Sequence, residues 1–134
     1  MSEPPLRRGT GRRLLIVDDE PNVLAGMQSY LQPLGFRVDC ARMKDEAEAL
    51  LERTSYDCLI ADLCLTPGRD PEGFEVIRFA RAVSPRTRIV VLTALEGQDT
   101  AAESLRQGAD LCLHKPQRLS EIVRIVNELV EPAG

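Results

Sequence analysis

The chain of 134 residues carries a formal net charge of -4, and 43% of its residues are hydrophobic. This length is sufficient for one domain with a core of its own, and the acidic balance argues against broad nucleic-acid binding, which depends on a basic surface. No stretch approaches the roughly 20 apolar residues of a membrane span, and the amino end lacks the apolar segment of a signal peptide. We therefore expect a cytoplasmic protein that binds neither nucleic acid nor membrane.

The cysteines and the single histidine carry little metal-binding signal. Cysteines stand at positions 40, 58, 64 and 112 without a Cys-x-x-Cys pair, and His114 is the only histidine. This spacing argues against a zinc site and favours free thiols in a reducing compartment. The only basic block, which contains Arg7, Arg8, Arg12 and Arg13, is interpreted as a solvated arm.

Three apolar runs without alternation predict strands at residues 14–17, 58–61 and 89–92. Such runs are typical of central strands that are covered on both faces of a parallel sheet. Residues 36–40 alternate between apolar and polar side chains, which indicates a strand at a sheet edge with one more polar face. A short apolar run at 111–113 predicts a fifth strand.

Apolar residues recur at helical spacing after each of these strands. Pro21 suits a first helical position, and Gly35 suits a C-cap. Thr100 opens a Thr-Ala-Ala-Glu capping box, and Gly108 would end the helix that begins there. Five repeats of strand then helix predict a parallel sheet with right-handed crossovers and helices on both faces. The helices are expected at about 21–34, 44–53, 74–83, 100–107 and 119–130.

Polar groups follow four of the predicted strands. Asp18 and Asp19 follow the first strand, Asp62 the third, Thr93 the fourth and Lys115 the fifth. Because ligands collect at the carboxyl ends of strands in open α/β sheets, we expect these groups to share one edge. Clustered carboxylates repel one another unless a cation offsets their charge, and Mg²⁺ suits a site of carboxylates, a carbonyl and waters.

An ionised Asp62 beside such an ion can attack phosphorus and form an aspartyl phosphate. Lys115 would hold a phosphoryl oxygen by its charge and Thr93 by its hydroxyl, while the metal ion neutralises the developing charge. The residues therefore predict phosphoryl transfer to Asp62, with Thr93 and Lys115 as the assisting groups.

In this order, the residues resemble the receiver domain of two-component response regulators. The resemblance covers about residues 13–131, which leaves 1–12 as a flexible basic leader and 132–134 as a tail. It is specific because all five chemical positions are filled. The matching motifs are Val17-Asp18-Asp19, Ile60-Ala61-Asp62-Leu63, Leu92-Thr93-Ala94, and Gly108-Ala109-Asp110 through Lys115-Pro116.

The resemblance implies a flavodoxin-like (βα)5 fold with strand order 2-1-3-4-5. It implies that Asp18, Asp19, Asp62 and the backbone carbonyl of Cys64 bind Mg²⁺, and that a histidine kinase or phosphotransfer protein donates the phosphoryl group. The domain would catalyse only its own phosphoryl transfer and dephosphorylation, so it is not expected to be an enzyme. It would signal by docking to a downstream protein, and two copies would pair through the helix at 100–107, the fifth strand and the last helix.

Three features depart from the resembled pattern. Pro67 and Gly73 lie later than the family places them, so the loop after Asp62 is about three residues longer. Cys112 stands three positions before the lysine, where the family usually has an aromatic switch residue. His114 directly precedes the lysine and is interpreted as a loop residue rather than a phosphate relay.

The sequence allows other interpretations. A pseudo-receiver would keep the fold as a phosphorylation-independent interaction module; Cys112 and the longer loop favour it, whereas the five filled positions argue against it. A metal-dependent phosphatase would carry its acids as Asp-x-Asp on one strand, but here Asp18 and Asp19 adjoin. Dinucleotide binding needs a glycine-rich first turn, which this chain lacks. The domain either stands alone and acts by docking, or has been separated from an output domain. Its last three residues would suit the start of a linker in the second case.

Overall fold

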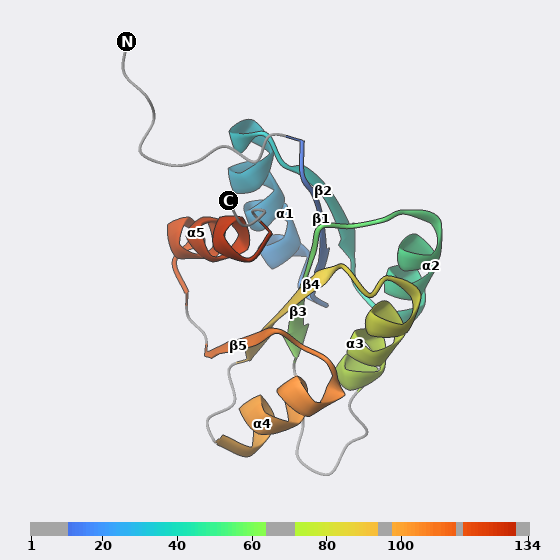
Figure 1. The fold of residues 1–134 in the computed structure, drawn as a ribbon. Coiled ribbons are helices and arrows are strands. Elements are labelled where there is room, and N and C mark those ends of the chain that lie inside the picture. The colour runs from blue at the N-terminus through green and yellow to red at the C-terminus, as the bar shows by residue number, and fades with distance from the viewer. Residues whose placement is uncertain (1–10, 64–71, 94–97, 115–116, 131–134) are drawn as a thin grey trace.

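The computed structural model describes residues 11–63, 72–93, 98–114 and 117–130 (Figure 1). Its strands form one parallel sheet in the order β2-β1-β3-β4-β5. This confirms the predicted flavodoxin-like topology, including the position of the alternating strand at an edge. The strands are β1 (Arg13–Val17), β2 (Arg37–Ala41), β3 (Cys58–Leu63), β4 (Arg88–Thr93) and β5 (Leu111–His114).

Helices cover both faces of the sheet. Side chains of α1 and α5 belong to one core cluster, and side chains of α2 and α3 belong to the other. Figure 1 shows the same division, with α4 beside β5 and α3. The helices are α1 (Pro21–Leu31), α2 (Lys44–Arg53), α3 (Glu72–Val83), α4 (Gln98–Gln107) and α5 (Leu119–Val130), and a short 3-10 helix, η1 (Gln32–Leu34), follows α1.

The central strands are buried on both faces. On β1, Leu15 packs with the cluster on the α2 and α3 side, whereas Leu14 and Ile16 pack with the cluster on the α1 and α5 side. On β3, Leu59 and Ile60 divide between the two clusters in the same way. The absence of alternation in these runs therefore has a direct cause, because each face of the strand meets a helix layer.

Two glycines end helical segments with positive φ. Gly35 follows η1 with φ 103°, and its N–H donates to the carbonyl of Gln32 at 2.9 Å. Gly108 follows α4 with φ 124°, and its N–H donates to the carbonyl of Leu105 at 3.1 Å. Glycine adopts this backbone conformation without steric cost, so both predicted helix ends are confirmed.

The helix starts are less accurately predicted than the helix ends. α2 has the expected bounds, 44–53. α3 begins at Glu72, ahead of the expected residue 74. α4 begins at Gln98, so Thr100 lies inside its first turn and its assignment as the cap residue was wrong. Acidic residues are favourable in a first helical turn, and the sequence has an acid at position 72 and another at position 99.

In the described part of the chain, no helix has the length and apolar character needed to cross a membrane.

The core assignment predicts a large difference between two leucines. Leu59 on β3 is 0% exposed, whereas Leu105 on α4 is 49% exposed. Because a buried Leu→Ala change leaves a cavity, we expect Leu59→Ala to lower the free energy of unfolding by about 2–5 kcal/mol. The matched Leu105→Ala change should alter it by less than about 0.5 kcal/mol. Urea denaturation measures both, and equal losses would contradict this assignment of the core.

Candidate functional site

The carboxyl ends of four strands meet at one edge of the sheet. The pairing register aligns Val17 with Ala61, so Asp18 and Asp62 follow partners on neighbouring strands. Leu63 pairs with Thr93, and Thr93 pairs with His114. Because neighbouring strands lie about 4.8 Å apart, this register gathers the acids of β1 and β3 and the hydroxyl of β4 within a small area.

The turn after β1 is formed by the acids themselves. The N–H of Asp18 continues the sheet by donating to the carbonyl of Ala41 at 3.0 Å. Its side chain is 3% exposed, and its Oδ1 accepts a hydrogen bond from the N–H of Glu20 at 2.8 Å. Pro21 then begins α1 at a position where its missing N–H costs nothing. This local structure turns the chain out of the sheet and leaves Asp19 exposed.

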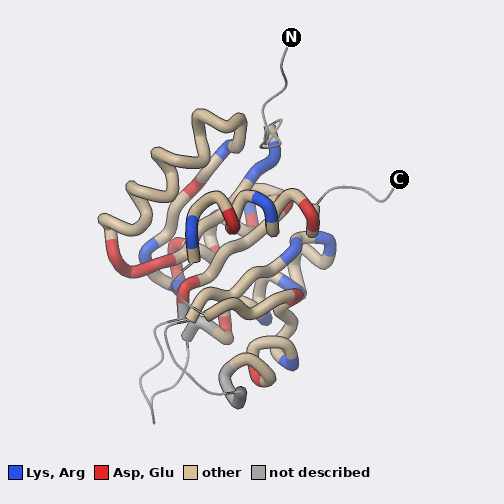
Figure 2. Tube along the Cα trace, turned by 90° about the vertical axis from the view of Figure 1, so that its left-hand side faces the viewer, with Lys and Arg blue, Asp and Glu red and all other residues tan. Residues whose placement is uncertain are grey.

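Figure 2 shows the acidic turn at residues 18–20 leading into α1, which carries no charged residue. Asp62 is half-buried on β3, and Thr93 is 3% exposed at the end of β4. The site therefore combines one exposed carboxylate, two more sheltered ones and a buried hydroxyl. Carboxylates that lie near one another favour the approach of a cation.

The donors suit a hard cation only in part. Carboxylate oxygens are the ligands that Mg²⁺ prefers, and Asp18, Asp19 and Asp62 supply them. Within the described ranges, however, no group of three or more His, Cys, Asp or Glu side chains is arranged to hold a metal ion. A metal bound here would need other oxygen donors as well, which fits an ion that commonly keeps several waters. The predicted carbonyl ligand, that of Cys64, lies outside the described residues.

β5 carries Cys112 and His114, two residues singled out in the sequence. Cys112 pairs with Val91 and packs against the core cluster on the α2 and α3 side. Burial raises the pKa of its thiol, and a hydrogen bond with Ser104 of α4 offsets this in part. His114 is exposed and is the last residue of β5, so its interpretation as a loop residue was wrong. Lys115 and residues 64–71, where the sequence predicts a longer loop, lie outside the described residues.

Sequence analysis missed Ser104, which is buried on α4. Its thiol partner, Cys112, belongs to a different element, and this relation leaves no periodic trace in the sequence. The only sequence signal for a buried serine was the composition of α4. The helix has few apolar residues, so a small polar residue can occupy its inner face.

The chain matches the family model of the response regulator receiver domain over residues 14–127. It belongs to this family. As a receiver domain, it is a signalling module of two-component response regulators. The predicted family is thereby confirmed.

Curated relatives of this receiver domain are longer proteins. The alginate biosynthesis transcriptional regulatory protein AlgB of Pseudomonas aeruginosa is 38% identical over 104 residues, which are 78% of this chain and 22% of AlgB. The transcriptional regulatory protein PrrA of Mycobacterium tuberculosis is 35% identical over 127 residues, 93% of this chain and 52% of PrrA. The chain thus spans between 22% and 52% of the length of these two relatives.

Solved receiver structures share the fold. A CheY-like receiver domain protein from Methanospirillum hungatei has a TM-score of 0.82 at 26% identity, covering 90% of this chain and 94% of that one. A response regulator from Burkholderia pseudomallei, with a phosphorylated aspartic acid, a calcium ion and citrate, has a TM-score of 0.78 at 30% identity, covering 86% and 66%. The beryllofluoride-activated NtrC4 receiver domain dimer has a TM-score of 0.77 at 26% identity, covering 89% and 96%.

The thiol environments predict selective alkylation. Burial raises the pKa of the thiols of Cys58 and Cys112, so less of each is thiolate at pH 8 than in an unfolded chain. We expect iodoacetamide to modify Cys112 more slowly in the folded protein than in urea, with a rate that rises with pH. Cys58, which is fully buried, should react only after unfolding. Peptide mass spectrometry locates the adducts, and equal rates in the folded and unfolded protein would contradict these environments.

Proposed function

We propose that this receiver domain accepts a phosphoryl group on Asp62 from a histidine kinase or phosphotransfer protein, in a Mg²⁺-dependent reaction. The observation that carries the proposal is the position of Asp62 at the carboxyl end of β3. This strand lies between β1, which leads into Asp18 and Asp19, and β4, which ends in Thr93. Family membership supports the same role for this acid.

In the proposed reaction, one carboxylate oxygen of Asp62 forms a bond to phosphorus as the bond between phosphorus and its donor atom breaks. Thr93 donates its hydroxyl proton in a hydrogen bond to a phosphoryl oxygen, and Lys115 supplies an ammonium group to another. Thr93 suits this task because its backbone is fixed in the sheet and its side chain is shielded from water. These two groups stabilise charge and do not themselves form a covalent bond.

Asp18, Asp19 and Asp62, with the carbonyl of Cys64, are proposed to hold the Mg²⁺. When bound, the ion would neutralise charge on the transferring phosphoryl oxygens. The Burkholderia pseudomallei response regulator, which contains a phosphorylated aspartic acid together with a calcium ion, supports a hard divalent cation at such a site. Asp19 is the exposed acid of the set and Asp18 is tied to the turn, so they would contribute unequally.

The signal is proposed to leave the site through a phosphorylation-dependent docking surface. Cys112 offers far less area to exchange between buried and exposed positions than an aromatic ring, which buries about 150–250 Å². The conformational change that follows phosphorylation is therefore expected to pass mainly from Thr93 to α4 and the segment before it. The face formed by α4, β5 and α5 is proposed to pair two copies, and the beryllofluoride-activated NtrC4 receiver domain, which is a dimer, supports pairing of this kind.

The first test concerns the phosphoacceptor. Asp62→Asn preserves the shape of the side chain but removes the nucleophilic charge, so we expect no phosphate after incubation with acetyl phosphate and Mg²⁺. Intact-mass spectrometry measures the addition. Asp57→Asn is the matched control, since Asp57 precedes the same strand at its other end, and this variant should still gain phosphate. Unchanged phosphorylation of Asp62→Asn would contradict the assignment.

The second test concerns the metal ligands. Because Mg²⁺ has few protein ligands here, we expect Asp19→Ala to weaken its binding by about tenfold or more and to stop phosphorylation. The control is Glu52→Ala, which removes an exposed acid from the last turn of α2. Backbone amide shifts during a Mg²⁺ titration measure the affinity. Equal affinities in the two variants would show that Asp19 is not a ligand.

The third test concerns the readout. A beryllium fluoride mimic should shift the amide resonances of α4 more than those of β5, both in the wild type and in Cys112→Ser. The small side chain at this position gives β5 little to rearrange. Large shifts confined to β5, and lost in the serine variant, would instead identify Cys112 as the switch.

A further inference from the structure

The edge strand β5 is fixed at its start by a single carboxylate. β5 has four residues and pairs only with β4. Just before it, the N–H of Asp110 donates to the carbonyl of Ile89 at 2.8 Å, and Asp110 Oδ2 accepts a hydrogen bond from the N–H of Ile89 at 2.8 Å. The Asp110 carboxylate thus takes the place of a main-chain carbonyl as acceptor. It extends the pairing of β4 and β5 by one position beyond the Val90–Leu111 pair.

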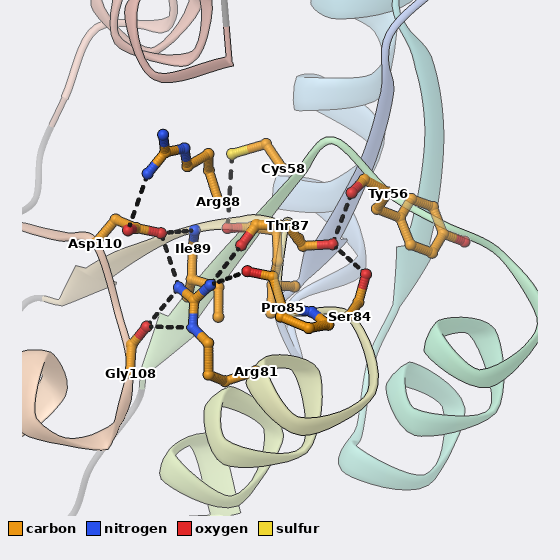
Figure 3. A network of polar contacts seen from close by, with 11 residues as sticks. Tyr56, Cys58, Arg81, Ser84, Pro85, Thr87, Arg88, Ile89, Gly108 and Asp110 are labelled. Carbon is orange, nitrogen blue, oxygen red and sulfur yellow. Dashed lines mark hydrogen bonds and ion pairs between the residues drawn. The ribbon is translucent and has the colours of Figure 1, made fainter.

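Arg81 on α3 holds this carboxylate in place (Figure 3). Its Nη2 donates to Asp110 Oδ2 at 2.9 Å and to the carbonyl of Gly108 at 2.7 Å. Its Nη1 donates to the carbonyls of Pro85 and Thr87, at 2.8 and 3.0 Å. One guanidinium group therefore ties the end of α3 to the turn before β4 and to the turn before β5.

Gly108 permits the backbone turn in this arrangement. Its φ of 124° is unfavourable for other residues, and a Cβ at this position would lie 3.4 Å from Arg81 Cβ. A side chain here would therefore strain the turn. The Gly-Ala-Asp motif that marks the family in the sequence thus has a physical role at this turn: the glycine permits the positive φ, and the aspartate accepts a hydrogen bond from the arginine.

Asp57 provides an internal comparison. Before β3, its N–H donates to the carbonyl of Arg13 and its Oδ2 accepts from the N–H of Arg13, both at 2.8 Å. This is the same pair of bonds that Asp110 makes with Ile89. β3, however, has six residues and lies between β1 and β4, so two neighbours fix its register. β5 has one neighbour, and the register depends more strongly on Asp110.

We propose that Arg81 and Asp110 are positioning residues that fix the register of β5 and thereby the point from which the chain continues to Lys115, the next residue in the sequence. The inference rests on the proposed function, in which Lys115 contacts the phosphoryl group. A slip of one residue would turn each β5 side chain to the opposite face and shift the strand by about 3.3 Å. Such a displacement exceeds the tolerance of a charge-assisting group, for which about 1 Å is already costly.

The experiment compares Arg81→Ala and Asp110→Ala with the control Asp57→Ala. Phosphorylation by phosphoramidate is followed at saturating Mg²⁺, at a temperature where circular dichroism shows each variant folded. We expect both test variants to be phosphorylated at least about tenfold more slowly than the wild type, and the control within about twofold of it. Mg²⁺ affinity should stay within about twofold in all three, because the proposed ligands follow β1 and β3.

Two further measurements separate positioning from general stability. Hydrogen exchange should become faster at the amides of β5 in Arg81→Ala, but not at those of β1 and β3. Arg81→Lys keeps a charge beside Asp110 but lacks the guanidinium fork, so its rate should lie between those of the wild type and Arg81→Ala. Asp110→Asn, which keeps an acceptor for the N–H of Ile89, replaces Asp110→Ala if the latter does not fold and should also be slowed.

The outcomes distinguish the two proposals. A wild-type protein that takes up no phosphate from any donor would contradict the proposed function itself. A wild-type protein that is phosphorylated, with Arg81→Ala equally fast, would contradict the positioning role and leave the function intact. Equal slowing in Asp57→Ala and Asp110→Ala would also overturn the positioning role, because it would show a general loss of stability.

Discussion

Parallel pairing of the strands in one register is the constraint on which the rest of this structure depends. It brings the carboxyl ends of β1, β3 and β4 to a single edge of the sheet, although these strands are separated by dozens of residues in the sequence. The pairing is held by side chains that are buried on both faces, such as Leu15 and Ile60.

The fold could be predicted because its signals are local. Unbroken apolar runs marked the central strands, and alternation marked the edge strand β2. Two local assignments were wrong. Thr100 has the spacing of a capping box, yet α4 begins two residues before it. His114 was assigned to a loop, yet it is the last residue of β5. Asp110 was recognised as part of a motif, but its pairing with Arg81 was missed because the two residues are 29 positions apart and meet only in the folded chain. The roles of the acids at the site were inferred from residue type and order, and they stay predictions.

The two edges of the sheet have different proposed roles. The acids and the hydroxyl that are proposed to bind a cation and a phosphoryl group lie at the carboxyl edge, whereas Asp57 and Asp110 close strand pairings at the amino edge. A strand is rigid over a few residues, so an anchor at one end fixes the position of a group at the other. For β5, which has a single neighbour, this places the accuracy of the site under the control of residues far from it. On the described part of β5, Cys112 also contacts α4 through Ser104.

The central claim is that Asp62 becomes the aspartyl phosphate. The most direct measurement is to treat the protein with a small phosphodonor, reduce it with borohydride and sequence its peptides by mass spectrometry. Borohydride converts an aspartyl phosphate to homoserine and leaves a free aspartate unchanged. The account predicts homoserine at position 62 alone, formed only when Mg²⁺ is present. Homoserine at Asp18 or Asp19, or its absence from position 62 in a protein that has gained phosphate, would contradict it.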